Sequence, residues 1–148
     1  MKNLSLFLLV LFSATVMTFS GCDKDEEYDN MEIITNNYTG DVVFTDVGVT
    51  PDGDFTGNGD SGTFSFAWIN NRNKTELDFD ITTPNGGTVQ FIITDANGDE
   101  VLNKTKTAGV GDDSFSGVSS KGVAGTWIVT IILTDFNGDG SFSLTPIE

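Results

Sequence analysis

Apolar and polar residues alternate along much of the chain. Residues 63–68 read Thr-Phe-Ser-Phe-Ala-Trp, and the same period of two recurs at residues 77–82, 89–93 and 142–144. A period of two with one polar face is typical of antiparallel strands that pack on one side. No segment after residue 21 shows a convincing helical period.

Residues 127–133 are apolar in both phases except for Thr130, which predicts a central strand covered on both faces. Stretches rich in glycine, asparagine and aspartate predict turns between the strands; they are NYTG, PDGDFTGNGDSG, NNRNK, PNGG, ANGD, AGVGDD and FNGDG. We therefore expect residues 31–148 to form one all-β domain. The expected fold is an antiparallel β-sandwich, jelly-roll or immunoglobulin-like, of about eight strands.

Residues 1–21 have a different pattern, in which Lys2 precedes an apolar run that ends at small residues. The run is shorter than the roughly 20 residues of a membrane-spanning helix and is typical of a secretory signal peptide. The stretch Phe19-Ser20-Gly21-Cys22 resembles the lipobox of bacterial lipoproteins. That resemblance implies cleavage before Cys22 and acylation of this residue, the only cysteine of the chain. The alternative is a cleaved signal peptide followed by an incidental cysteine.

The residues after Cys22 are strongly charged. Lys24-Asp25-Glu26-Glu27 resembles the acidic export signal of Bacteroidota surface lipoproteins, which implies an outer-membrane anchor and a domain facing the cell exterior. In other Gram-negative lineages, an aspartate at the position of Asp23 marks retention in the inner membrane. Residues 22–30 carry no apolar period and are expected to form a flexible acidic tether.

The charge of the chain limits its partners. The sequence has 7 basic and 22 acidic residues, a formal charge of −15, and removal of residues 1–21 leaves 6 basic residues and a charge of −16. Nucleic-acid binders need a basic face, so we expect no nucleic-acid partner. Anionic lipid would be repelled, so the acyl group on Cys22 is expected to hold the protein, as a monomer, to the membrane.

The sequence offers little for catalysis. It has no histidine, which removes the commonest general base and the commonest zinc ligand, and it has no GxSxG motif around a serine. We therefore expect no enzyme activity. The alternative is a small glycoside hydrolase that uses a pair of carboxylates.

One motif, Thr-Asp-x-Asn-Gly-Asp, occurs twice, at residues 94–99 and 134–139. The simpler hypothesis makes each copy a hairpin turn centred on Asn-Gly. The second copy also matches the first half of an EF-hand calcium loop, but its twelfth position is Pro146, which excludes an EF-hand. A looser calcium site stays open as an alternative, and no cofactor is required. Its ligands would be Asp95, Asn97, Asp99, Asp135, Asn137 and Asp139.

Three other features are candidates for binding. The loop that contains Asn71, Arg72 and Lys74 carries two basic residues against an acidic background and could recognise a glycan or a protein, although a solvated turn is the simpler interpretation. Trp68 and Trp127 could form a platform for sugar, but their apolar strand neighbours favour core positions. The acid-rich stretch 52–60 could be a further loop around an ion.

The C-terminal segment carries a further resemblance. Gly125-Thr126-Trp127-Ile128-Val129 and Gly140-Ser141-Phe142-Ser143-Leu144 resemble the closing strands of pre-peptidase C-terminal and P-domain-like β-sandwiches. This resemblance implies a non-catalytic module of a secreted bacterial protein. The sequence as a whole therefore favours a surface module that binds a glycan or an envelope protein. A calcium-stabilised adhesion or spacer domain is the remaining alternative.

Overall fold

The structure, a computed structural model, describes residues 31–33, 38–46, 48–83, 86–109 and 113–148. These residues form eight β-strands and no helix, so none of them forms a helix that could cross a membrane. The strands are β1 (Met31–Ile33), β2 (Val42–Asp46), β3 (Asp52–Asn70), β4 (Lys74–Thr82), β5 (Thr88–Thr94), β6 (Glu100–Thr107), β7 (Ser114–Val118) and β8 (Gly125–Ile147). The predicted signal peptide and the whole predicted tether, residues 22–30 with Cys22, lie outside the described residues.

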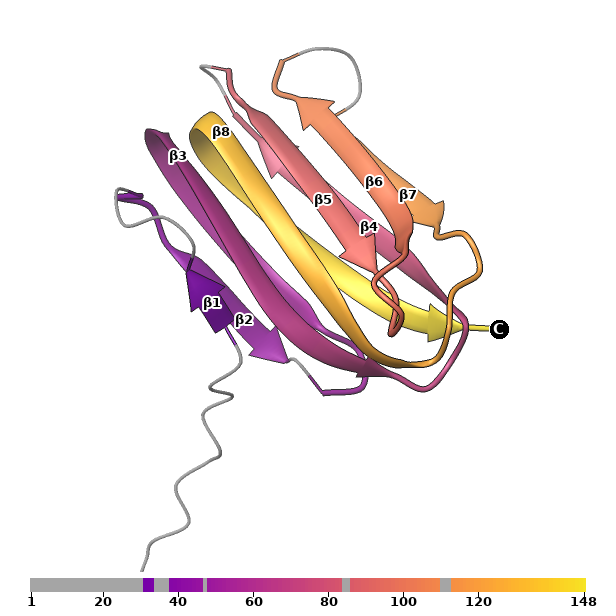
Figure 1. The fold of residues 1–148 in the computed structure, drawn as a ribbon. Helices are drawn as coiled ribbons and strands as arrows, with labels where there is room; N and C mark the ends of the chain where they lie inside the picture. The colour runs from indigo at the N-terminus through magenta and orange to yellow at the C-terminus, as the bar shows by residue number, and fades with distance from the viewer. Residues whose placement is uncertain (1–30, 34–37, 47, 84–85, 110–112) are drawn as a thin grey trace, which may run out of the picture.

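The strands form an antiparallel β-sandwich of two layers (Figure 1). Layer A consists of β2, the first half of β3, the second half of β8, β4 and β7. Layer B consists of β1, the second half of β3, the first half of β8, β5 and β6. β3 and β8 therefore run side by side through both layers and form the centre of each.

β3 and β8 bend together where they pass from one layer to the other. The register between them shifts twice, between Asn58 and Asp60 and between Asp60 and Gly62. Gly59 has a φ of 95° and Asp135 a φ of 47°, both in the left-handed region that costs a residue other than glycine some strain. A shift in register means that one strand has an extra residue, a β-bulge, which bends the strand pair without ending it.

Aromatic rings from both layers meet in the core. Phe91 of layer B stacks on Phe79 of layer A, with ring centroids 4.8 Å apart, and lies 5.4 Å from the ring of Phe142. All three side chains belong to the apolar phase of the predicted alternating strands, and all three are buried. The prediction of strands packed on one side is thus confirmed. Trp68 and Trp127 are also buried, as their strand neighbours indicated.

Two predicted turns are in fact parts of long strands. FNGDG lies inside β8, and most of PDGDFTGNGDSG lies inside β3, so the expected loop at residues 52–60 is wrong. Glycine is typical of turns, but in these two strands it permits close packing. A Cβ on Gly138 would lie 2.2 Å from the carbonyl oxygen of Thr82, and one on Gly140 would lie 2.4 Å from the ring of Phe55.

Two further expectations change for the same reason. The segments expected to be two closing strands, 125–129 and 140–144, belong to the single bent strand β8. Residues 127–133 are central in layer B, as predicted, because β8 lies between β3 and β5. They are not covered on both faces, however, since Ile128 is 39% exposed.

Candidate functional site

Three strands of layer A carry the same short pattern, a phenylalanine between two identical polar residues. The triplets are Asp78-Phe79-Asp80 on β4, Ser114-Phe115-Ser116 on β7 and Ser141-Phe142-Ser143 on β8. Phe79 is the register partner of both Phe115 and Phe142, so the three triplets lie directly side by side. Because successive side chains point to opposite faces of a strand, the aspartates and serines share the outer face of layer A.

The polar residues form two rows across the three strands. Asp78 lies between Ser116 and Ser143, and Asp80 lies between Ser114 and Ser141. Neighbouring strands are about 4.8 Å apart and residues of one strand that share a face about 6.6 Å apart, which sets the spacing of this grid. Each row therefore presents one carboxylate acceptor between two hydroxyl groups that can donate or accept.

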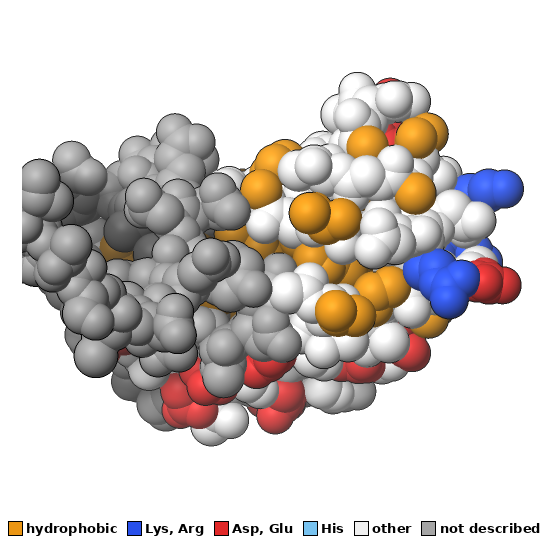
Figure 2. Space-filling view, turned by 90° about the horizontal axis from the view of Figure 1, so that it is seen from below, with side chains coloured by type: hydrophobic (Ala, Val, Ile, Leu, Met, Phe, Trp, Pro, Cys, Tyr) orange, Lys and Arg blue, Asp and Glu red, His pale blue; other side chains and the backbone are white. Residues whose placement is uncertain are grey.

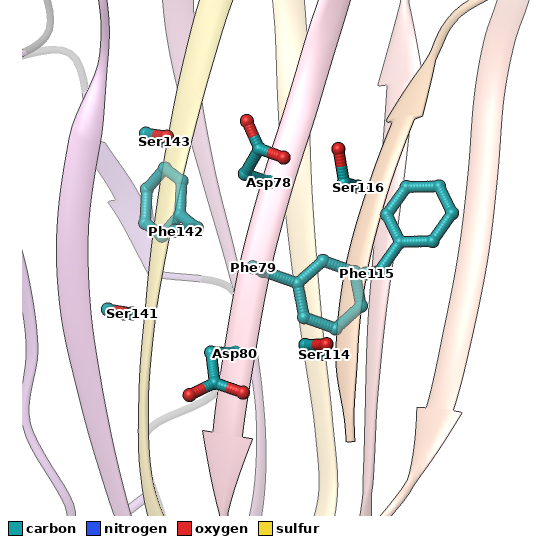
Figure 3. A pocket seen from close by; sticks show the side chains of 9 residues that line it. All are labelled: Asp78, Phe79, Asp80, Ser114, Phe115, Ser116, Ser141, Phe142 and Ser143. Carbon is teal, nitrogen blue, oxygen red and sulfur yellow. The ribbon is translucent and has the colours of Figure 1, made fainter. Parts of the chain in front are cut away.

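These nine residues line a surface hollow of about 370 Å³, which we call the Asp-Ser groove (Figure 3). Phe79 and Phe142 are 3% and 4% exposed, and the half-buried Phe115 lies at the edge of the layer. The Phe115 ring packs 5.5 Å from that of Phe79, and Nζ of Lys104 lies 4.9 Å from its centroid. The Phe115 ring therefore lies on the inner side of layer A, toward β6, and the outer face of the groove presents carboxylate and hydroxyl groups.

The remainder of this face is also acidic. Asp54 is the register partner of Ser141, and Asp52 is the partner of Ser143. A second hollow of about 320 Å³ adjoins the groove and is lined by residues that include Asp54, Asp80 and Asp139. Among the described residues, no three acidic, cysteine or histidine side chains are arranged so that they could hold a metal ion. The resulting negative potential disfavours anionic ligands.

The two copies of the repeated motif lie in different surroundings. The first copy forms the β5–β6 hairpin, as predicted, but its loop spans residues 95–99, because Thr94 is the partner of Glu100. Asp95 is only 4% exposed. One carboxylate oxygen, Oδ1, accepts the N–H groups of Asn97 at 2.9 Å and Asp99 at 3.0 Å, and Oδ2 accepts that of Val123 at 2.7 Å.

These bonds define the role of Asp95. The N–H group of Val123 is the largest cause that holds the pKa of the Asp95 carboxyl below its usual range; burial opposes it, and the N–H groups of the hairpin loop reinforce it. The carboxylate joins the β5–β6 loop to the segment before β8. Both oxygens point to backbone donors, which is an arrangement for holding loops together.

The second copy is not a turn. Asp135, Asn137 and Asp139 follow one another along β8 where the strand bends. The N–H group of Asp135 donates to Oγ of Ser61 at 2.9 Å, and Ser61 in turn donates to Oδ1 of Asp135 at 3.4 Å. The hairpin hypothesis is therefore wrong for this copy. A calcium site at these residues stays a prediction.

The loop proposed for recognition is partly fixed by its own contacts. Oδ1 of the buried Asn70 accepts the N–H group of Arg72 at 2.9 Å, and the Arg72 guanidinium pairs with Glu148. Asn71 is exposed and Lys74 half-buried. These side chains lie at the end of the sandwich and take no part in the Asp-Ser groove.

The residues of the groove are not predicted from the sequence. The three x-Phe-x triplets were visible, and in each the polar phase repeats one residue type. Their meeting depends on the register of β4 with β7 and β8, however, and these strands are far apart along the chain. The only signal of the groove in the sequence is that each phenylalanine is flanked by two copies of the same polar residue.

No protein-family model and no curated protein matches the sequence. Among solved structures, the chain is similar to TmCBM61 in complex with β-1,4-galactotriose, at 12% identity and a TM-score of 0.48, covering 74% of this chain and 89% of that one. It is also similar to the CBM22-1 xylan-binding domain of Paenibacillus barcinonensis Xyn10C, with 13% identity, a TM-score of 0.45 and coverage of 80% and 86%.

A third similar structure is the family 11 carbohydrate-binding module of Clostridium thermocellum, bound to a β-1,3-1,4-mixed-linked tetrasaccharide. The identity is 9% and the TM-score 0.40, over 84% of this chain and 93% of that one. These structural neighbours are carbohydrate-binding modules with a β-sandwich fold. At such low identities and TM-scores they identify no ligand for this chain.

Proposed function

We propose that this chain is a surface lipoprotein whose β-sandwich binds a glycan in the Asp-Ser groove without catalysing a reaction. The observation that carries the proposal is the grid of two carboxylates and four serine hydroxyls, set in register on one open sheet face. Sugars present hydroxyl groups in pairs. A carboxylate accepts from both members of such a pair, while serines both donate and accept.

The charge of the face narrows the ligand class. Asp52, Asp54, Glu76 and Asp139 share the outer face of layer A with Asp78 and Asp80. Sulfated or uronic-acid glycans would face this negative field, so we propose a neutral glycan or one containing amino sugars. An envelope protein with a basic surface is the alternative partner.

The groove is arranged for binding more than for hydrolysis. Asp78 and Asp80 project from one strand to the same side, and they do not face each other across a cleft. A glycosidase holds the scissile bond between its two carboxylates. This geometry offers no such position, which supports a non-catalytic module.

The anchor forms part of the same proposal. Acylated Cys22 would hold the domain at the outer membrane, facing the cell exterior, through the tether that precedes β1. Replacing Cys22 by Ala should release the protein from membranes. Protease accessibility on intact cells then tests surface display, and a chain that is digested only after lysis would contradict it.

Affinity electrophoresis against a panel of neutral, amino-sugar and anionic polysaccharides tests the binding claim. We expect retardation by a neutral or amino-sugar polymer and loss of retardation in Asp78→Ala and Ser116→Ala. Asp99→Ala, an exposed carboxylate in the β5–β6 loop, is the matched control and should bind normally. Equal loss in the control, or release of reducing ends from any polymer, would refute a non-catalytic site in this groove.

A further inference from the structure

One end of the sandwich, which we call the entry end, exposes apolar side chains. It contains the β2–β3, β3–β4, β5–β6 and β7–β8 connections and the C-terminus. Val49 is 76% exposed, Ile69 63%, Val118 53% and Val123 46%. Figure 2, which views the molecule from below, shows several hydrophobic side chains spread over this surface. Single exposed apolar residues are ordinary, but a group at one end marks an interaction surface.

The charges at this end differ from those of the groove face. Arg72, Lys74 and Lys121 lie here, three of the five lysine and arginine residues that the structure describes. Arg72 pairs with Glu148, and the Asp95 carboxylate is buried and bonded to backbone N–H groups. Asp99 and Glu100 of the β5–β6 hairpin also lie at this end, so the entry end carries charges of both signs.

The chain also enters the domain from this end. β1 is antiparallel to β3, with Met31 opposite Phe66 and Ile33 opposite Phe64. β3 continues from Phe66 to Asn70 at the entry end, so the start of β1 is nearer to that end than its finish. Cys22 precedes Met31 by nine residues, which at about 3.5 Å per residue span about 30 Å at most.

We infer that the entry end rests against the lipid surface in which the acyl chains of Cys22 are embedded. The inference depends on the lipid anchor of the proposed function. The tether is too short to let the domain move far from the bilayer. It precedes β1 on the side of the domain that has the exposed valines and isoleucine and three of the five described lysine and arginine residues. Apolar side chains gain from partial burial at the lipid interface, and Arg72, Lys74 and Lys121 suit phosphate headgroups.

This orientation sets the position of the Asp-Ser groove. β4 begins at Lys74 at the entry end and reaches Asp78 and Asp80 four and six residues later. At about 3.3 Å per residue, the groove lies about 13–20 Å from the membrane. Its face runs along the strands and therefore points sideways, where a glycan strand parallel to the membrane could reach it. The acidic face also stays away from lipid phosphates.

Paramagnetic relaxation enhancement from gadolinium-chelating lipid tests the orientation. The full acylated protein, with labelled isoleucine and valine methyl groups, is reconstituted in phosphatidylcholine nanodiscs that contain this lipid. We expect the methyl groups of Ile69 and Val123 to relax at least ten times more strongly than that of Ile132, which lies near the opposite end. Val123→Asp should lower the enhancement at Ile69 several-fold, while Thr105→Asp on β6 should leave it unchanged.

The outcomes separate the orientation from the anchor. Equal enhancement at Ile69 and Ile132, or no effect of Val123→Asp in protein that still co-floats with lipid, would overturn the orientation alone. Protein that does not co-float would refute the anchor and the orientation together. If the Ile69 methyl shift depends on protein concentration without lipid, a second copy covers the entry end, and the inference is wrong.

Discussion

The two buried tryptophans test the packing, because the indole N–H of only one of them has a hydrogen-bond partner among the described residues. Trp68 and Trp127 are register partners on β3 and β8, 1% and 0% exposed, and their rings meet edge to face with centroids 6.0 Å apart. Nε1–H of Trp127 donates to the carbonyl oxygen of Val123 at 2.7 Å. Nε1 of Trp68 is buried and has no partner among the described residues.

Replacing either tryptophan by phenylalanine removes a similar volume. A residual cavity of about 40 Å³ costs about 1 kcal/mol at roughly 24 cal/mol per Å³. Trp127→Phe also loses a hydrogen bond worth about 1 kcal/mol, although the Val123 carbonyl keeps a longer bond from the Ala96 N–H at 3.4 Å. We therefore expect Trp127→Phe to lower the free energy of unfolding by about 2 kcal/mol.

Trp68→Phe should behave differently. It removes a buried donor without a partner, and such a donor costs about 1–3 kcal/mol, which offsets the cavity. The expected change in the free energy of unfolding is close to zero or slightly stabilising. Urea denaturation followed by far-ultraviolet circular dichroism measures both variants without depending on tryptophan fluorescence. If Trp68→Phe destabilises as much as Trp127→Phe, the hydrogen bond to Val123 does not distinguish the two sites and the reasoning fails.

Three further predictions concern charge and metal. Asp95→Asn should lower Tm by on the order of 5 °C or more, whereas Asp135→Asn, in the second copy of the motif, should change it little. Because the pKa of Asp95 is lowered in the fold, the stability that its carboxylate contributes is present above the unfolded pKa and is lost as the pH falls through the folded pKa. The Tm values of the two variants should therefore converge in acid. Burial, helped by Asp60 and Asp41, raises the pKa of Tyr38 to about 12, so stability should fall between about pH 10 and 12, and Tyr38→Phe should remove this step in an alkaline denaturation series. Calcium and magnesium at millimolar concentration should shift the melting curve equally in about 0.15 M sodium chloride; a calcium-specific rise that Asp135→Ala abolishes would instead establish a site there.

The sequence predicts the strands well where side chains alternate. Phe79, Phe91 and Phe142 each follow the period of two, and each is buried as expected. The glycine-rich stretches gave two wrong predictions of turns. Gly138 lies inside β8 because Thr82 of the neighbouring strand approaches too closely for a Cβ, and a single sequence does not reveal that contact. The bend in β3 and β8 therefore could not be told from a hairpin.

The candidate site could not be predicted from the sequence for a related reason. Asp78 and Asp80 lie on the polar phase of β4, where charged residues are usually just solvated. Their significance comes from Ser116 and Ser143, which the fold brings to either side of Asp78. Register between distant strands is a property of the tertiary structure, and the local pattern contains no information on it.

The most direct test of the central claim is a map of ligand contacts by nuclear magnetic resonance. The domain is labelled with ¹⁵N and titrated with the polysaccharide that retards it most strongly. We predict that amide shifts concentrate in β4, β7 and the second half of β8, around Asp78, Ser116 and Ser143, and vanish in Asp78→Ala. Shifts confined to the entry end or to the outer face of layer B, with the Asp-Ser groove unchanged, would contradict the account.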